Sequence, residues 1–95
     1  MILVGLERLA VFAEGHSDAR NWIDNWIAAT KEAKWKAPGD VKSQYKSVDN
    51  LPGGKGLIFN VKGNAYRMQV KVNYAAGVAL VVRIATHKEY LRWTY

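Results

Sequence analysis

Hydrophobic and polar residues alternate with a helical period in the first half of the chain. A short apolar run at residues 1–4 predicts a strand. Apolar positions spaced three and four apart then predict one helix over residues 6–15 and a second helix from Ser17 to about Lys34. We expect Ser17 to be the N-cap of the second helix, with Asp18 in its first turn, where the helix dipole favours an anion.

The second half of the chain has the period of two that is typical of strands. Residues 57–61 and 66–74 alternate and are joined by a glycine-containing hairpin loop. After a second such loop, residues 78–85 are apolar on both faces except for Arg83, which favours a central strand. Residues 46–56 are polar and contain the turn signal Pro-Gly-Gly, so they predict a loop.

Two further segments have weaker patterns. Residues 35–42 contain a proline and a glycine and predict a loop, in which Asp40 is expected to cap a single helical turn through Tyr45. Residues 87–95 allow a short terminal helix.

The order of these elements predicts an α+β fold, with two N-terminal helices packed on a mainly antiparallel four-stranded sheet (β-α-α-β-β-β). The helices should cover one face of the sheet with Trp22 and Trp26. The other face should expose Arg67, Gln69 and Lys71, which share one side of the most regular strand.

Length and composition limit the possible classes of protein. The 95 residues allow one domain, residues 1–95. The absence of cysteine excludes a disulfide scaffold and a thiolate metal site, and two histidines cannot bind a metal without carboxylates, so we expect no metal and no cofactor. Nothing approaches 18 consecutive apolar residues, so no membrane span is predicted. We expect a cytoplasmic protein.

The positive charge is concentrated in one part of the chain. The net charge is +6, of which residues 1–30 contribute −2 and residues 31–95 contribute +8. This asymmetry indicates a positive face that binds a polyanion, either nucleic acid or an acidic protein. The alternative is a solvated surface that is merely basic.

Candidate catalytic chemistry is cationic and lies around the most regular strand and the segment after the last strand. RNA cleavage by a ribose 2′-hydroxyl needs a base, a cation beside the phosphorane charge, and an acid. Arginine, histidine and tyrosine can supply all three without a metal. The candidates are Arg67, Lys71, Lys62, Asn64, His87, Lys88 and Tyr90. Each also has a structural interpretation, as a surface arginine, a capping histidine or a tyrosine that anchors the following segment.

Two motifs in this region resemble a known family. Residues 59–67, Phe-Asn-Val-Lys-Gly-Asn-Ala-Tyr-Arg, followed by residues 86–90, Thr-His-Lys-Glu-Tyr, resemble the HigB-type toxins of the RelE/ParE superfamily. Residues 33–42 look like the linker that such toxins carry after their second helix. The resemblance implies a RelE-like fold and the toxin of a type II toxin-antitoxin system. The implied activity is an mRNA endoribonuclease that acts on translating ribosomes.

The resemblance also implies roles for individual residues. Arg67 matches the arginine placed on the scissile phosphate, and His87 and Tyr90 match the region of the acid-base residues. A general pattern of RNA contacts is matched by Asn60, Lys62, Asn64, Lys71 and Lys88. Leu91 departs from the family, because many relatives have an aspartate there. The implied partners are mRNA and a HigA-type antitoxin with a helix-turn-helix domain.

Two other functions stay open at this point. A toxin of the same fold can poison a protein target such as gyrase and cut nothing, and it would not need Arg67, His87 and Tyr90 together. A non-catalytic RNA-binding module would present exposed aromatic platforms.

Overall fold

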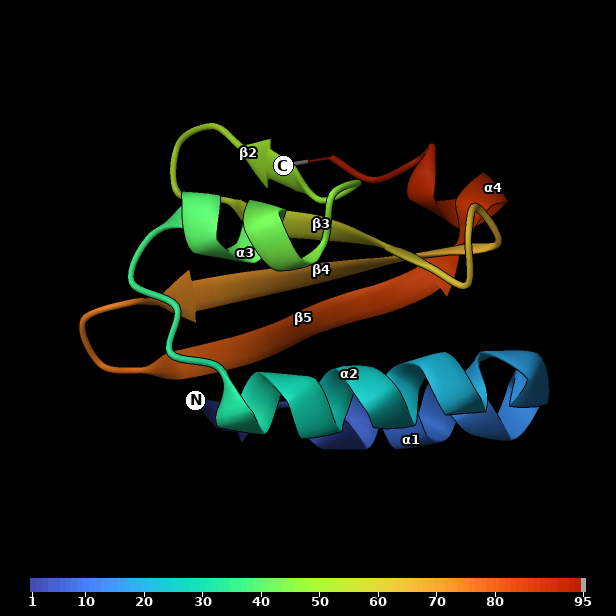
Figure 1. Ribbon diagram of the computed structural model, residues 1–95. Helices are drawn as coiled ribbons and strands as arrows, with labels where there is room; N and C mark the ends of the chain where they lie inside the picture. The colour runs from blue at the N-terminus through green and yellow to red at the C-terminus, as the bar shows by residue number, and fades with distance from the viewer. Residues whose placement is uncertain (95) are drawn as a thin grey trace.

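The computed structural model describes residues 1–94, which form one mixed sheet and a set of helices (Figure 1). In chain order the elements are β1 (Ile2–Val4), α1 (Leu6–Gly15), a 3₁₀ turn (Ser17–Ala19), α2 (Arg20–Glu32), α3 (Pro38–Gln44), β2 (Asp49–Leu51), β3 (Gly56–Val61), β4 (Tyr66–Asn73), β5 (Val78–Thr86) and α4 (His87–Tyr90). The strands lie in the order β1-β5-β4-β3-β2. β1 is parallel to β5, and the other neighbours are antiparallel.

The α+β arrangement with two early helices agrees with the sequence prediction, but the sheet has five strands instead of four. The additional strand is β2, within the polar stretch that predicted a loop. It pairs antiparallel with β3, so that Asp49 lies opposite Ile58 and Leu51 lies opposite Gly56. A short edge strand forms through backbone hydrogen bonds to its neighbour, and it therefore leaves little hydrophobic pattern in the sequence.

Both long helices lie on one side of the sheet, the side that carries Phe59 (Figure 1). Trp26 of α2 is 1% exposed, and its ring meets the Phe59 ring edge-on with 5.6 Å between centroids. The expected burial of Trp26 against the sheet is confirmed. Trp22 is only half-buried, and its ring lies 6.4 Å from that of Tyr45. Burying a side chain such as Phe59 stabilises the fold by about 1.5–3 kcal/mol.

The starts of two helices are not capped in the way that the sequence predicted. Ser17 opens the 3₁₀ turn, and no side chain caps this turn or α2. The backbone N–H of Arg20 is instead satisfied by the carbonyl of Ser17. α3 begins at Pro38, before Asp40, and the Asp40 carboxylate accepts hydrogen bonds from the N–H groups of residues 36 and 37, at 2.8 and 3.2 Å. The acid therefore stabilises the helix start from within the first turn.

The turn between β1 and α1 passes unusually close to β5. Gly5 has a φ of +85°, and a Cβ atom at this position would lie 2.6 Å from the carbonyl oxygen of Val81. Only glycine fits this conformation and this approach without strain. Arg8 donates from Nη1 to the same carbonyl at 3.0 Å, so the first turn of α1 is tied to β5.

The face of the sheet away from the helices is covered at its centre. Ile58 is fully buried there, and Gln69 is only 4% exposed, so the prediction that Gln69 is exposed is wrong. Residues 91–94, which we call the tail segment, turn back from α4 toward β2 in the view of Figure 1. Arg83, opposite Gln69 on β5, donates from Nη2 to the carbonyl of Thr94 at 3.3 Å. The tail segment therefore lies over this face.

Candidate functional site

α4 presents two of the predicted catalytic residues immediately after β5. Its start is fixed by a capping box, in which the Thr86 hydroxyl accepts from the N–H of Glu89 at 3.2 Å. In return, Glu89 Oε1 accepts from the backbone N–H of Thr86 at 3.3 Å and from its hydroxyl at 2.9 Å. His87 and Tyr90 are three residues apart, which places them on one face of the turn. Their ring centroids are 6.0 Å apart.

β4 brings Arg67 under this turn. In the sheet, Arg67 lies between Asn60 of β3 and Ala85 of β5. Its Nη1 donates to the carbonyl of Tyr66 at 3.1 Å. The guanidinium carbon lies 5.5 Å from the centroid of the Tyr90 ring, which is within the range of a cation–π contact.

The structure thus brings Arg67, His87 and Tyr90 together at one end of the sheet. The backbone N–H of His87 donates to the carbonyl of Ala65 at 3.2 Å, which ties α4 to the loop between β3 and β4. His87 is exposed, and the other two side chains are half-buried. Arginine is a permanent cation with five donors, imidazole exchanges protons near neutral pH, and a phenol can donate or accept a hydrogen bond. Together they can bind a phosphate and move protons beside it.

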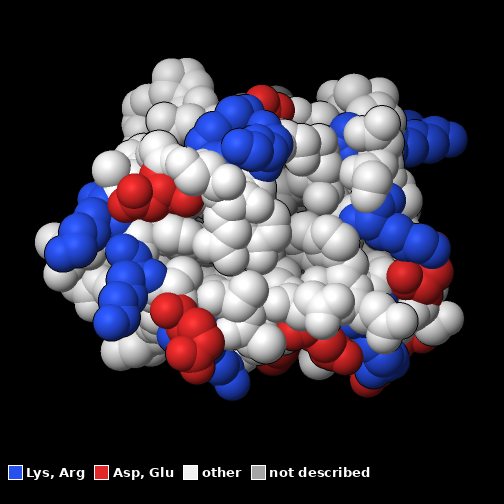
Figure 2. Space-filling view, viewed as in Figure 1, with Lys and Arg blue, Asp and Glu red and all other residues white. Residues whose placement is uncertain are grey.

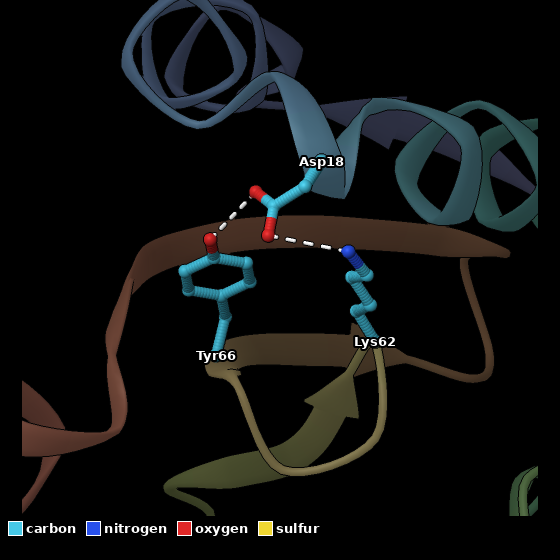
Figure 3. Close-up of polar contacts among 3 residues, drawn as sticks. All are labelled: Asp18, Lys62 and Tyr66. Carbon is cyan, nitrogen blue, oxygen red and sulfur yellow. Dashed lines mark hydrogen bonds and ion pairs between the residues drawn. The ribbon is translucent and has the colours of Figure 1, made fainter.

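Lys62 is engaged elsewhere, on the side of the hairpin that faces the helices (Figure 3). Its ammonium lies 3.3 Å from Oδ2 of Asp18, and the Tyr66 hydroxyl donates to Oδ1 of Asp18 at 2.6 Å. The hydrogen bond from Tyr66, followed by the contact with Lys62, holds the pKa of Asp18 below its ordinary value. The same hydrogen bond raises the pKa of Tyr66. The structure therefore gives Lys62 an ion pair with the helical layer and separates it from Arg67.

The other predicted RNA contacts divide into two groups. Asn60 lies beside Arg67, while Asn64 in the β3–β4 loop and Lys88 in α4 are exposed at the same end of the molecule. Lys71 is exposed toward the other end of β4, about 13 Å from Arg67 along the strand. It forms no ion pair with any residue from 1 to 94.

The sequence analysis missed a set of polar contacts at the centre of this face. Gln69 donates from Nε2 to the carbonyl of Lys55 at 2.9 Å and accepts from Nε of Arg83 at 2.7 Å. The guanidinium carbon of Arg83 lies 4.2 Å from the centroid of the Trp93 ring. The only signal in the sequence was Arg83 itself, the single charge within the apolar run 78–85.

Positive and negative side chains both occur on the face of the molecule that Figure 2 shows. Figure 2 shows Lys and Arg side chains toward both ends of the face in view and along its upper side, with Asp and Glu between them. This face therefore carries both signs. Within residues 1–94, no three histidine or acidic side chains gather closely enough to hold a metal ion. No helix in that range has the length and apolarity needed to cross a bilayer.

Comparison with known protein families agrees with this fold. The family model of the HigB toxins, described as the RelE-like toxic component of a toxin-antitoxin system, matches residues 19–93. This range contains α2, four of the five strands and α4. The chain therefore belongs to the HigB toxin family, and membership implies an antitoxin partner. No curated protein matches the chain.

Proposed function

We propose that this HigB-family toxin is an mRNA endoribonuclease that needs no metal ion and acts on translating ribosomes in the cytoplasm. The observation that carries the proposal is the meeting of Arg67, His87 and Tyr90 at one end of the sheet. The Tyr90 ring centroid lies 5.5 Å from the Arg67 guanidinium carbon and 6.0 Å from the His87 ring centroid. A cation and two proton-exchanging groups are what RNA cleavage by a 2′-hydroxyl requires.

The proposed reaction begins when a base takes the proton of the ribose 2′-hydroxyl and the oxygen attacks the adjacent phosphorus. Arg67 stabilises the negative charge that develops on the phosphorane oxygens. An acid then gives a proton to the leaving 5′ oxygen. His87 and Tyr90 supply this base and this acid. The products are a 2′,3′-cyclic phosphate, or the 3′-phosphate formed by its hydrolysis, and a 5′-hydroxyl end.

Replacing Arg67 tests the phosphate contact. We expect Arg67→Ala to lower mRNA cleavage by about 100-fold or more, because one charge-stabilising donor is worth about that much. The thermal unfolding temperature should change little, because Arg67 is only half-buried and its backbone pairing is retained. Primer extension on mRNA from cells that express equal amounts of each variant measures the effect. Arg20→Ala, on the helical layer, is the matched control. An Arg67→Ala variant that unfolds, or that cuts mRNA as wild type does, contradicts the assignment.

Replacing His87 separates chemistry from binding. His87→Gln keeps a polar side chain of similar size but removes the titratable ring, so single-turnover cleavage should fall sharply while RNA affinity stays nearly constant. Lys88→Ala, at the neighbouring position, should instead weaken RNA binding and leave cleavage of bound RNA intact. Filter binding and single-turnover cleavage on the same RNA measure both effects. Normal cleavage by His87→Gln would move the proton-transfer role to another residue.

The proposal includes neutralisation by a HigA-type antitoxin with a helix-turn-helix domain. The net charge of +6 favours an acidic antitoxin segment. The co-purified complex should fail to cut mRNA, and a complex as active as the free toxin contradicts neutralisation by masking. Growth arrest with intact mRNA and inhibited gyrase would support the protein-poisoning function instead.

A further inference from the structure

α4 is too short to hold its own shape. It has four residues and no buried side chain, and a single turn is far below the length at which an isolated helix is stable in water. The capping box of Thr86 and Glu89 fixes only the first end of the turn. The second end, which carries Tyr90, depends on contacts made by the next residues of the chain.

The tail segment supplies that support. Trp93 continues the turn, because its backbone N–H donates to the carbonyl of Tyr90 at 3.0 Å. The Trp93 ring also meets the Tyr90 ring edge-on, with 5.4 Å between centroids. Tyr90 in turn stands 5.5 Å from the guanidinium carbon of Arg67. The position of Tyr90 above Arg67 therefore depends on the position of Trp93.

Trp93 is itself held by the sheet through Arg83. The Arg83 guanidinium lies over the Trp93 ring at 4.2 Å, and its Nη2 donates to the carbonyl of Thr94 at 3.3 Å. Its Nε donates at 2.7 Å to Gln69, which is only 4% exposed. The amide of Gln69 is oriented at its other end by the carbonyl of Lys55, at 2.9 Å. Arg83 is thus a planar group fixed on one edge by the sheet, with its face against Trp93.

We propose that Arg83 and Trp93 are positioning residues, which dock the tail segment on the sheet and thereby hold Tyr90 over Arg67. This inference rests on the proposed function, because Tyr90 and Arg67 act there on RNA. It also assigns Trp93 a role other than base stacking, since the Arg83 guanidinium occupies one side of the ring and the ring is half-buried. A misplacement of about 1 Å between reacting groups can lower a rate about 100-fold.

The central variant is Trp93→Ala, compared with Trp93→Phe and with Leu91→Ala. Leu91 belongs to the same segment and is 69% exposed, so its truncation is the matched control. We expect Trp93→Ala to lower kcat at least tenfold and to change KM less than about twofold, the signature of a lost transition-state arrangement. Trp93→Phe should recover most of kcat, because a ring still faces Arg83. Leu91→Ala should have the kcat and KM of wild type.

A measurement without RNA accompanies these kinetics. The nuclear Overhauser effect between the Tyr90 ring and the Arg67 side chain should be present in wild type and in Leu91→Ala, and lost in Trp93→Ala. Arg83→Lys keeps the charge but removes the planar group, so it should lose the same signal. Combining it with Trp93→Ala should lower kcat little further, because the two residues act as one unit. Thermal unfolding checks that each variant is folded.

The outcomes separate the two proposals. If wild type cuts no RNA, the proposed function fails, and the Tyr90–Arg67 signal alone decides whether Trp93 and Arg83 hold the site. A Trp93→Ala variant that keeps this signal or wild-type kcat overturns the positioning role. A raised KM with unchanged kcat also overturns it, because that result assigns Trp93 to RNA binding by stacking.

Discussion

The carboxylate of Asp18 joins segments that are far apart in the sequence. It accepts a hydrogen bond from Tyr66, at 2.6 Å, and pairs with Lys62, so the corner between α1 and α2 is linked to the β3–β4 hairpin (Figure 3). Tyr66 also meets the stacked rings of Phe12 and His16 edge-on. Because Arg67 comes directly after Tyr66, this cluster fixes the strand end on which the proposed site stands.

We predict that Asp18 makes the stability of the folded protein depend on pH in the acidic range. The pKa of Asp18 is lowered in the folded protein, so its contribution to stability is fully present above an unfolded pKa of about 4. That contribution is lost as pH falls through the lower, folded pKa. Asp18→Asn should therefore lower the free energy of unfolding at pH 7 and flatten its decline in acid. Urea unfolding at pH 7 and at pH values from 4 to 2 measures the free energy of unfolding and its decline in acid.

Two variants make this test specific. Tyr66→Phe removes the largest cause of the lowered pKa of Asp18, so it should reproduce part of the lost acid dependence. Asp24→Asn, an exposed acid on α2, should leave the unfolding curves unchanged. An Asp18→Asn variant with wild-type stability at pH 7 would show that the contacts in Figure 3 contribute nothing.

Single residues could be predicted from the sequence where their strand pattern was regular and their neighbours local. Arg67 lies near α4, which carries His87 and Tyr90, because the start of β4 pairs with the end of β5 and α4 follows β5 directly. Gln69 could not be predicted to be buried, because its hydrogen-bond partners, Lys55 and Arg83, are each 14 residues away in the sequence. Lys62 likewise gained an acidic partner 44 residues away, which no local pattern indicates.

At the scale of elements, α4 depends on its cap. We predict that Thr86→Ala lowers cleavage while thermal unfolding shifts by no more than a few degrees. The lost cap costs the turn about 0.5–2 kcal/mol, but α4 buries no side chain, so the core is unaffected. Amide hydrogen exchange across residues 87–90 should accelerate in the same variant. Thr94→Ala is the control, because Thr94 offers Arg83 only its backbone carbonyl. Unchanged exchange in Thr86→Ala would contradict this role of the cap.

The elements with a strong hydrophobic period were predicted closely, and those formed by pairing or capping were not. α1 and the strands β3, β4 and β5 were found within a residue or two of their predicted bounds. β2 was missed because its strand character comes from β3 and not from its own side chains. The terminal helix predicted over residues 87–95 is a single turn, α4, and Tyr95 lies outside the described residues.

At the scale of the whole molecule, the tail segment divides the face opposite the helices. Arg67 stands on one side of the Gln69–Arg83 contact and Lys71 on the other, because the three β4 residues alternate along one strand face. RNA that reaches both cations must therefore pass over or beside the tail segment. Under the proposed function, the RNA backbone would meet Lys71 away from the scissile phosphate, because Lys71 lies about 13 Å from Arg67 along the strand.

We predict that Lys71→Ala weakens RNA binding for all sequences and leaves single-turnover cleavage of bound RNA unchanged. The salt dependence of the affinity should flatten by about 0.7 in log–log slope, the value for one released counterion on a single strand. Filter binding at several salt concentrations measures the slope. Lys31→Ala, an exposed cation on α2, provides the control. Equal slopes for Lys71→Ala and wild type would place the RNA elsewhere.

The parallel pairing of β1 with β5 sets an order of events during synthesis. Ile2 pairs with Val78, so β1 must wait for a partner that is translated 76 residues later. The turn that carries His87 and Tyr90 comes later still, and the segment that holds it is made after that. A chain made only as far as Thr86 therefore has α1, α2, α3 and all five strands, but lacks the turn that carries two of the three proposed catalytic residues. We therefore expect the pairing of all five strands to be possible before Arg67, His87 and Tyr90 can come together.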